Sequence, residues 1–186
     1  MESLKAYRRV ISDKMREKWE SSFKFSTVSR MKGNNPWNHW YSVLRTPVTK
    51  VDDQLWLGSA FDAANKGTLD SCGIKTIINC SLELDHYFIQ SGEYIYLRVP
   101  ILDVGTSDMS DHFQTVINWF QQAEKPILLH CYMGSSRSAI LAVLWLIKMR
   151  GMQFDAAMKY LLEKRPVVNI NLVYLLQLRN FLALGR

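Results

Sequence analysis

Hydrophobic and polar positions from residue 47 onward alternate between short apolar runs and longer patterns of helical period. Short runs rich in β-branched and aromatic residues predict a strand pair at 51–57 and strands at 74–79, 94–99 and 127–130. Apolar spacings of three and four predict helices at 61–72 (with a break near Gly67), 110–124, 137–150, 153–164 and 170–184. Ser110 is placed to cap the second helix, and Gly151 to end the third. This alternation predicts an α/β domain with a mostly parallel central sheet flanked by helices.

The first 46 residues follow a different pattern and predict a separate helical arm. Residues 4–20 indicate an amphipathic helix, 21–36 a polar linker, and 37–45 a second short helix or hydrophobic clasp. An isolated helix of this length is marginal in water, so the arm needs a surface to pack on. That surface could be its own domain, a second copy of the chain or another partner, and we expect a homodimer formed through the arm. The predicted domains are 1–46, the arm, and 47–186, the α/β domain.

Net charge separates the same two parts. Residues 1–50 carry 11 Lys+Arg and 4 Asp+Glu, which is +7, whereas residues 51–186 carry 12 and 13, which is −1. The basic character therefore belongs to the arm, and we expect a solvated basic helix face more than a nucleic-acid site. The longest apolar run, 139–147, is too short to span a membrane. Three widely spaced cysteines and a charged N-terminus favour an intracellular protein, cytoplasmic or nuclear.

The segment 127–138, Ile-Leu-Leu-His-Cys-Tyr-Met-Gly-Ser-Ser-Arg-Ser, carries the chemistry. A short strand delivers Cys131, Arg137 follows six residues later, and a long apolar helix begins there. A loop of this length can turn its N–H groups inward, while the helix N-terminus and the guanidinium add positive charge. Such a cup stabilises a thiolate and binds a phosphate dianion, so the pattern predicts phosphoryl transfer to sulfur. The alternative is an inert buried cysteine.

This motif, His-Cys-x5-Arg followed by Ser138, resembles the signature of the protein tyrosine phosphatase superfamily, and its flanks resemble the dual-specificity phosphatases. Residues 51–60, 77–81 and 163–171 also resemble stretches of that family. The resemblance covers about residues 47–184. It implies a three-layer protein tyrosine phosphatase-like fold and hydrolysis of phosphotyrosine and phosphoserine/phosphothreonine in proteins through a phosphocysteine intermediate. No metal and no cofactor is expected, and phosphorylated proteins are the expected substrates.

Each loop residue has an expected role. Cys131 attacks phosphorus, Arg137 holds phosphate oxygens, and Ser138 donates to the sulfur so that the thiolate can leave. His130 is expected to orient the loop by hydrogen bonding or to be a satisfied core histidine. The phosphate is expected to lie on the backbone N–H groups of six consecutive residues: Tyr132, Met133, Gly134, Ser135, Ser136 and Arg137.

The resemblance implies that Asp103, in the loop after strand 94–99, is the general acid, and Asp108 in the same loop is the competing candidate. Two alternatives remain for the function. One is a phosphoprotein-binding scaffold that has lost turnover, and the other is an RNA 5′-phosphatase or lipid phosphatase of the same superfamily. The loop contains no lysine, which disfavours a highly charged inositol lipid, and its Met133 stands where the family often has alanine.

Overall fold

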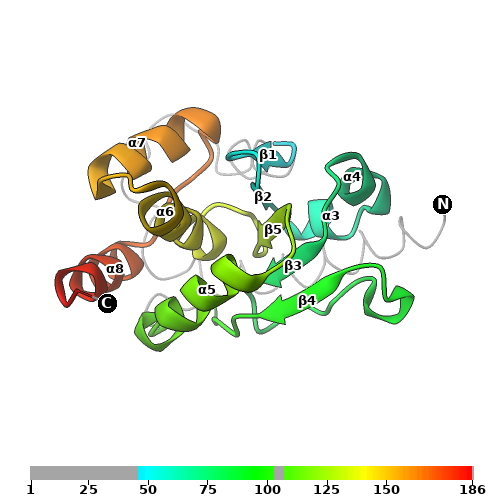
Figure 1. Cartoon of the computed structure of the whole chain (residues 1–186), viewed down its shortest axis with the longest axis horizontal. Coiled ribbons are helices and arrows are strands. Elements are labelled where there is room, and N and C mark those ends of the chain that lie inside the picture. The colour runs from blue at the N-terminus through cyan, green and yellow to red at the C-terminus, as the bar shows by residue number, and fades with distance from the viewer. Residues whose placement is uncertain (1–45, 103–106, 186) are drawn as a thin grey trace, which may run out of the picture. The chain divides into compact units, whose positions relative to one another are not determined.

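The computed structural model describes residues 46–102 and 107–185 (Figure 1). In these ranges five strands form one sheet in the order β1-β2-β5-β3-β4. β1 pairs with β2 in antiparallel fashion, and the other neighbours are parallel. The strands are β1 (Thr49–Lys50), β2 (Leu55–Gly58), β3 (Thr76–Asn79), β4 (Ile95–Arg98) and β5 (Ile127–His130). The helices are α3 (Ala60–Ala63), α4 (Lys66–Ser71), η1 (Ile89–Ser91), α5 (Ser110–Gln122), α6 (Arg137–Arg150), α7 (Phe154–Lys164) and α8 (Leu172–Ala183).

Both faces of the sheet are buried, which gives the molecule three layers. Alternate side chains of β5 point to opposite faces, so Leu129 joins the large core under α5–α8 while Leu128 joins the smaller core with α3 and α4. Figure 1 shows these two groups of helices on opposite sides of the strands. The predicted α/β class, the mostly parallel sheet and the flanking helices are confirmed.

Helix α6 is the central helix of the larger layer. Its first ten residues, Arg137–Leu146, are all buried, which confirms the expectation from its apolar sequence. It packs against β5 and β2 on one side and contacts α5, α7 and α8 on the others. Gly151 ends it with φ of +68°. Because α6 is held from every side, its first residue, Arg137, has a well-defined place relative to the end of β5.

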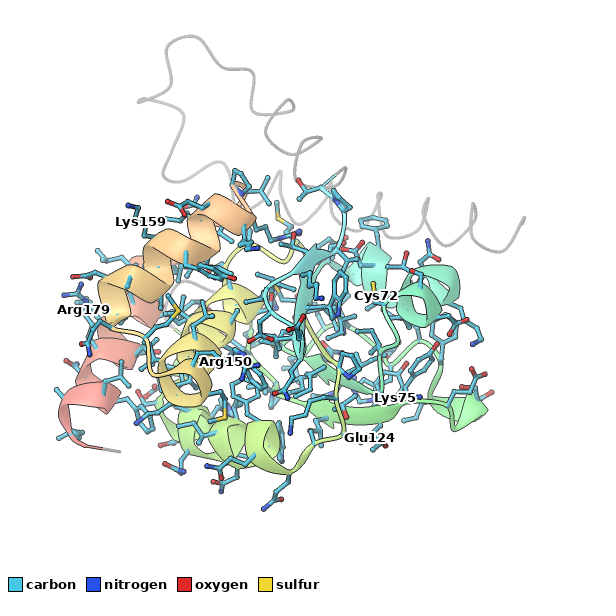
Figure 2. The ribbon with its side chains drawn as sticks, turned by 45° about the horizontal axis from the view of Figure 1, so that its top comes forward. Cys72, Lys75, Glu124, Arg150, Lys159 and Arg179 are labelled. Atoms are coloured by element: carbon cyan, nitrogen blue, oxygen red, sulfur yellow. The ribbon has the colours of Figure 1, made fainter. Side chains whose placement is uncertain are left out.

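The predicted strand pair at 51–57 is present with other bounds, since β1 lies at Thr49–Lys50 and β2 begins at Leu55. Residues 51–54 form the turn between β1 and β2, in which Asp52 Oδ1 accepts from the N–H groups of Gln54 and Leu55. The other oxygen of Asp52 accepts from Trp145 Nε1 at 2.6 Å and from Arg150 Nε at 2.7 Å. Figure 2 marks Arg150 at the end of α6, close to this turn. The turn is polar because it is tied to α6, which the local pattern does not reveal.

Two helix boundaries also differ from the predictions. The predicted helix 61–72 is two helices, and the break lies at Ala64–Asn65, where the Asn65 side chain caps α4, while Gly67 lies inside α4. Ser110 is the first residue of α5 and not its cap. The Ser110 N–H is instead satisfied by Asp108 Oδ1 at 2.8 Å. The predicted arm helices and linker, 4–45, lie outside the described residues.

The three central parallel strands end together. Register pairs Gly58 of β2 and Asn79 of β3 with His130 of β5. Ligands of parallel α/β sheets bind beyond the carboxyl ends of the strands. The loop that follows His130 therefore lies at the edge of the sheet where a binding site is expected.

Candidate active site

The loop between β5 and α6 has its carbonyl groups held on its outer side. Five consecutive carbonyl oxygens accept hydrogen bonds from other parts of the domain. The donors are Ala60 N to Tyr132 O (3.0 Å), Arg165 Nη2 to Met133 O (3.3 Å), Arg165 Nε to Gly134 O (2.9 Å), Asn169 N to Ser135 O (2.9 Å) and Ile140 N to Ser136 O (2.9 Å).

This arrangement decides where the loop's N–H groups point. A peptide unit is planar and trans, so the N–H after each carbonyl points to the opposite side. The carbonyls point outward to their donors, so the N–H groups of residues 133–137 turn toward the inside of the loop. One of them reaches the sulfur, since Gly134 N lies 3.3 Å from Cys131 Sγ. The result is a nest of donors around the cysteine, which suits an anion.

Gly134 is required by this geometry. It has φ of +67°, and a Cβ built there would lie 2.3 Å from Gly58 O and 2.9 Å from Arg165 Nη2. Any side chain would push the loop away from the end of β2. The mid-loop glycine thus allows the tight contact between the loop and the strand beside it.

Cys131 is only 2% exposed, at the bottom of this loop. Burial alone raises the pKa of its thiol, but the nearby charge of Arg137, the hydroxyl and N–H of Ser138 and the N–H of Gly134 outweigh it, and the pKa is lowered. Ser138 Oγ lies 3.2 Å from Cys131 Sγ and is fully buried. The sulfur therefore sits where its thiolate is favoured, with a hydroxyl donor in contact.

Arg137 is held by a partner that sequence reasoning missed. Its Nη1 donates to both carboxylate oxygens of Glu83, at 2.7 and 2.9 Å, and to Ile101 O at 3.1 Å. The Arg137 side chain is 3% exposed and that of Glu83 is 26% exposed. Glu83 follows β3, and the carboxyl end of β3 lies beside that of β5. Its position shortly after a predicted strand was the one feature of the sequence that could have indicated a place in the site. The pair fixes the guanidinium beside the loop.

His130 is buried at the end of β5, and its Nδ1 lies 3.4 Å from Cys131 O. Burial is the main reason that its pKa falls to about 3. The imidazole is therefore neutral at any working pH, and such a group is a poor proton donor or acceptor for catalysis near neutrality.

The two candidate acids are not equivalent. Asp103 lies outside the described residues, so its role stays a prediction. Asp108 is exposed, and its pKa is lowered chiefly because its carboxylate accepts from the backbone N–H of Ser110. A carboxylate tied to a helix N-terminus holds its proton poorly, which argues against Asp108 as the general acid.

The rim of the loop is made by half-buried residues, and it is joined to the C-terminal part of the domain. Tyr132, Met133, Ser135 and Ser136 are all partly exposed. Ser136 Oγ accepts from Asn171 N at 3.1 Å, at the start of α8.

Among residues 46–102 and 107–185, no group of three or more His, Cys, Asp or Glu side chains could hold a metal ion.

Comparison with known proteins identifies this arrangement. Residues 55–183 match the family model "Dual specificity phosphatase, catalytic domain", and the chain belongs to this family. It is 30% identical over 138 residues to dual specificity protein phosphatase Mpk3 of Drosophila melanogaster, which covers 73% of this chain and 34% of that protein. It is 30% identical over 130 residues to dual specificity protein phosphatase 1 of Homo sapiens, covering 68% and 35%.

Solved structures give the same fold. The crystal structure of human DUSP28 is similar with a TM-score of 0.69 and 27% identity, covering 76% of this chain and 97% of that one. The human tyrosine phosphatase-like serine/threonine/tyrosine-interacting protein is similar with a TM-score of 0.66 and 25% identity, covering 76% and 99%. The chain spans about a third of the length of the curated relatives it matches.

No helix of the described part has the length and apolar character needed to cross a membrane.

The three cysteines should differ in reactivity. Burial raises the pKa of Cys80 well above its usual value and raises that of Cys72, whereas the pKa of Cys131 is lowered. A lowered pKa means that the thiolate is populated at a lower pH than in an ordinary cysteine, and the anion-binding loop should attract iodoacetate. We expect Cys131 to be alkylated first, with a pH midpoint below that of Cys72, and Cys80 to resist.

Peptide mass spectrometry after timed iodoacetate treatment between pH 5.5 and 9 measures this order. Cys72 at the end of α4 serves as the internal control, and Figure 2 shows it on the opposite side of the molecule from α7 and α8. A midpoint for Cys131 at or above that of Cys72 would contradict the electrostatic description of the loop.

Proposed function

We propose that this chain is a cysteine-dependent protein phosphatase that hydrolyses phosphotyrosine and phosphoserine/phosphothreonine through a phosphocysteine intermediate. The observation that carries the proposal is the loop itself: the Cys131 sulfur lies 3.3 Å from the Gly134 N–H and 3.2 Å from the Ser138 hydroxyl, beside the buried Arg137. Donors that stabilise a thiolate also stabilise the oxygens of a phosphoryl group in transfer.

In the first step, the Cys131 thiolate attacks phosphorus and an S–P bond forms as the ester P–O bond breaks. The leaving oxygen takes a proton, which we assign to Asp103. The N–H groups of residues 132–137 and the guanidinium of Arg137 hold the equatorial oxygens. Glu83 and Ile101 O keep that guanidinium in place, so little reorganisation is needed as charge develops.

In the second step, water attacks phosphorus, the S–P bond breaks and inorganic phosphate leaves. The aspartate that gave its proton now accepts one from the water. The Ser138 hydroxyl donates to the departing sulfur, which makes the thiolate a better leaving group. His130 supports the loop by packing and by its contact with Cys131 O, and it transfers no proton in either step.

Two exposed leucines, each next to a residue that is hydrogen-bonded to Arg137 or to the loop, support a protein substrate over a highly charged small molecule. Leu102 follows Ile101, whose carbonyl binds Arg137, and is 47% exposed. Leu172 follows Asn171, whose N–H binds Ser136 Oγ, and is 68% exposed. These side chains offer contacts to the residues flanking a phosphorylated side chain, whereas an inositol lipid headgroup would need cations there.

A phosphoprotein-binding scaffold remains the second candidate, because the human tyrosine phosphatase-like serine/threonine/tyrosine-interacting protein shares the fold. The site favours turnover, since the Ser138 hydroxyl contacts the Cys131 sulfur and the charge of Arg137 acts on it. Three free thiols and a thiolate nucleophile favour a reducing intracellular location.

We also propose that residues 1–46 mediate self-association. Light scattering that compares the oligomeric state of residues 1–186 with that of residues 46–186 tests this proposal.

The test of the proposed function is hydrolysis in EDTA and dithiothreitol, followed by a phosphopeptide panel. We expect wild type to hydrolyse p-nitrophenyl phosphate and peptides carrying phosphotyrosine and phosphothreonine. Acid quenching of Ser138→Ala during turnover should trap a phosphorylated peptide containing Cys131, because the second step is slowed. Phosphopeptide binding without hydrolysis by wild type would instead establish the scaffold.

The general acid is tested by leaving-group dependence. If Asp103 protonates the leaving oxygen, Asp103→Asn should lower kcat on phenyl phosphate by on the order of 10²-fold while p-nitrophenyl phosphate, with its good leaving group, is affected far less. Asp108→Asn, which alters the contact with Ser110 in the same loop, is the matched control and should leave both rates within about twofold. Equal losses on both substrates in Asp103→Asn would remove Asp103 from this role.

A further inference from the structure

Arg165 is a fully buried cation directly behind the phosphate-binding loop. It follows the last residue of α7 and is 0% exposed. Its Nε and Nη2 donate to Gly134 O and Met133 O, and its Nη1 donates to Pro47 O at 2.8 Å and to Thr49 Oγ1 at 3.0 Å. Every nitrogen of the guanidinium is thus used, two for the loop and one for the chain that enters β1.

All four acceptors are uncharged. Within the described residues no carboxylate is hydrogen-bonded to Arg165. Its charge interacts instead over longer range with Asp62 and with the anionic form of Cys131. An arginine stays protonated even when burial lowers its pKa, as it does here. A buried cation is costly unless anions lie near it, and here the Cys131 thiolate and a bound phosphate would supply that negative charge.

The hydrogen bonds of Arg165 act on the two central peptide units of the loop. Holding Met133 O outward turns the N–H of Gly134 inward, and holding Gly134 O outward turns the N–H of Ser135 inward. The first of these N–H groups is the one that touches the Cys131 sulfur. The other three outward carbonyls are held by backbone N–H groups, so Arg165 is the side chain that completes the set.

We propose that Arg165 is a positioning residue of the phosphatase reaction: from behind the loop, its guanidinium aims the Gly134 and Ser135 N–H groups at the phosphate and provides a second positive charge beside the thiolate. This inference rests on the proposed function. Arg165 does not touch substrate, since Gly134 lies between its guanidinium and the inside of the loop. Pro47 O and Thr49 Oγ1 hold the third nitrogen, so the planar fork is fixed before phosphate arrives.

The experiment uses the full chain with Arg165→Met, Arg165→Lys and, as a matched control, Arg179→Met. Arg179 is a surface arginine on α8 that pairs with Asp155. Two readouts need no turnover: the pH midpoint for iodoacetate alkylation of Cys131, and the concentration of inorganic phosphate that protects Cys131 from it. Thermal unfolding reports how much of each variant is folded.

Arg165→Met should raise the alkylation midpoint and weaken phosphate protection at least tenfold, because both the charge and the aim of the two N–H groups are lost. Arg165→Lys keeps the charge, so its midpoint should stay close to wild type, but one ammonium cannot hold both carbonyls and protection should weaken at least threefold. Arg179→Met should match wild type in both.

Folded Arg165→Met with wild-type midpoint and wild-type phosphate protection would overturn the proposal. If Arg165→Met does not fold, Arg165→Lys decides, and unchanged phosphate protection in that variant overturns it. Wild type that alkylates with a low midpoint and is protected by phosphate, yet hydrolyses no phosphate ester, would refute the proposed function, and the variants would then show only that Arg165 positions the loop for phosphate binding.

Discussion

Cys131→Ser is expected to abolish hydrolysis of p-nitrophenyl phosphate, lowering kcat by on the order of 10⁴-fold or more. The loop is built to favour a thiolate: its donors and the Arg137 charge lower the pKa of the Cys131 thiol despite burial. A serine hydroxyl starts from a far higher pKa, and the same donors cannot ionise it near neutrality. His130, the residue before it, has a pKa of about 3 and is too weak a base to remove its proton.

The matched control is Cys72→Ser, which changes a partly exposed cysteine at the end of α4. Its kcat and KM should stay within about twofold of wild type, as for most surface substitutions. Cys131→Ser should still bind phosphate, because the N–H nest and Arg137 remain. Activity retained in Cys131→Ser would show that another group is the nucleophile, and the phosphocysteine mechanism would be wrong.

Arg137→Lys is expected to lower kcat/KM on the order of 10³-fold, although the formal charge is kept. The guanidinium engages Glu83 and Ile101 O through Nη1, and its planar shape presents further donors to a phosphate at the same time. An ammonium is a point charge on a flexible stem. If it pairs with Glu83, which remains nearby, it no longer faces the transferring phosphoryl oxygens.

Steady-state kinetics on p-nitrophenyl phosphate measure this loss, with Arg179→Lys as the matched control at an exposed ion pair. We expect kcat to fall more than KM rises, because the fork compensates charge that is greatest in the transition state. A loss under tenfold would mean that positive charge alone suffices and that the geometry set by Glu83 is unimportant to the reaction.

The core of the site could be predicted from sequence because it is local. Cys131, Arg137 and Ser138 lie within eight consecutive residues, and a buried strand followed by a loop and an apolar helix places them on one side of that loop. The strand at 127–130 and the helix at 137–150 were predicted at their observed bounds, since long or fully buried apolar segments carry the clearest pattern. The α/β class followed from the alternation of such segments.

Short polar boundaries were less predictable, because what satisfies them lies elsewhere in the fold. The polar turn at 51–54 separates the two strands of the predicted pair, and its Asp52 accepts hydrogen bonds from Trp145 and Arg150 on α6. The predicted helix break was Gly67 and the predicted cap was Ser110. In the structure the side chains of Asn65 and Asp108 accept hydrogen bonds from the N–H groups at the starts of α4 and α5, and these bonds set the two boundaries.

What the sequence by itself determined is that Cys131, Arg137 and Ser138 lie on one loop between a strand and a helix, and which layers carry that loop, because these depend on near neighbours and on hydrophobic periodicity. What only the tertiary structure decided is how the loop is held. Glu83 and Arg165 lie 54 and 31 residues from the loop residues they bind. Hydrogen bonds are directional and their partners can be any distance apart in the chain, so the orientation of each peptide group in the loop is a property of the folded domain.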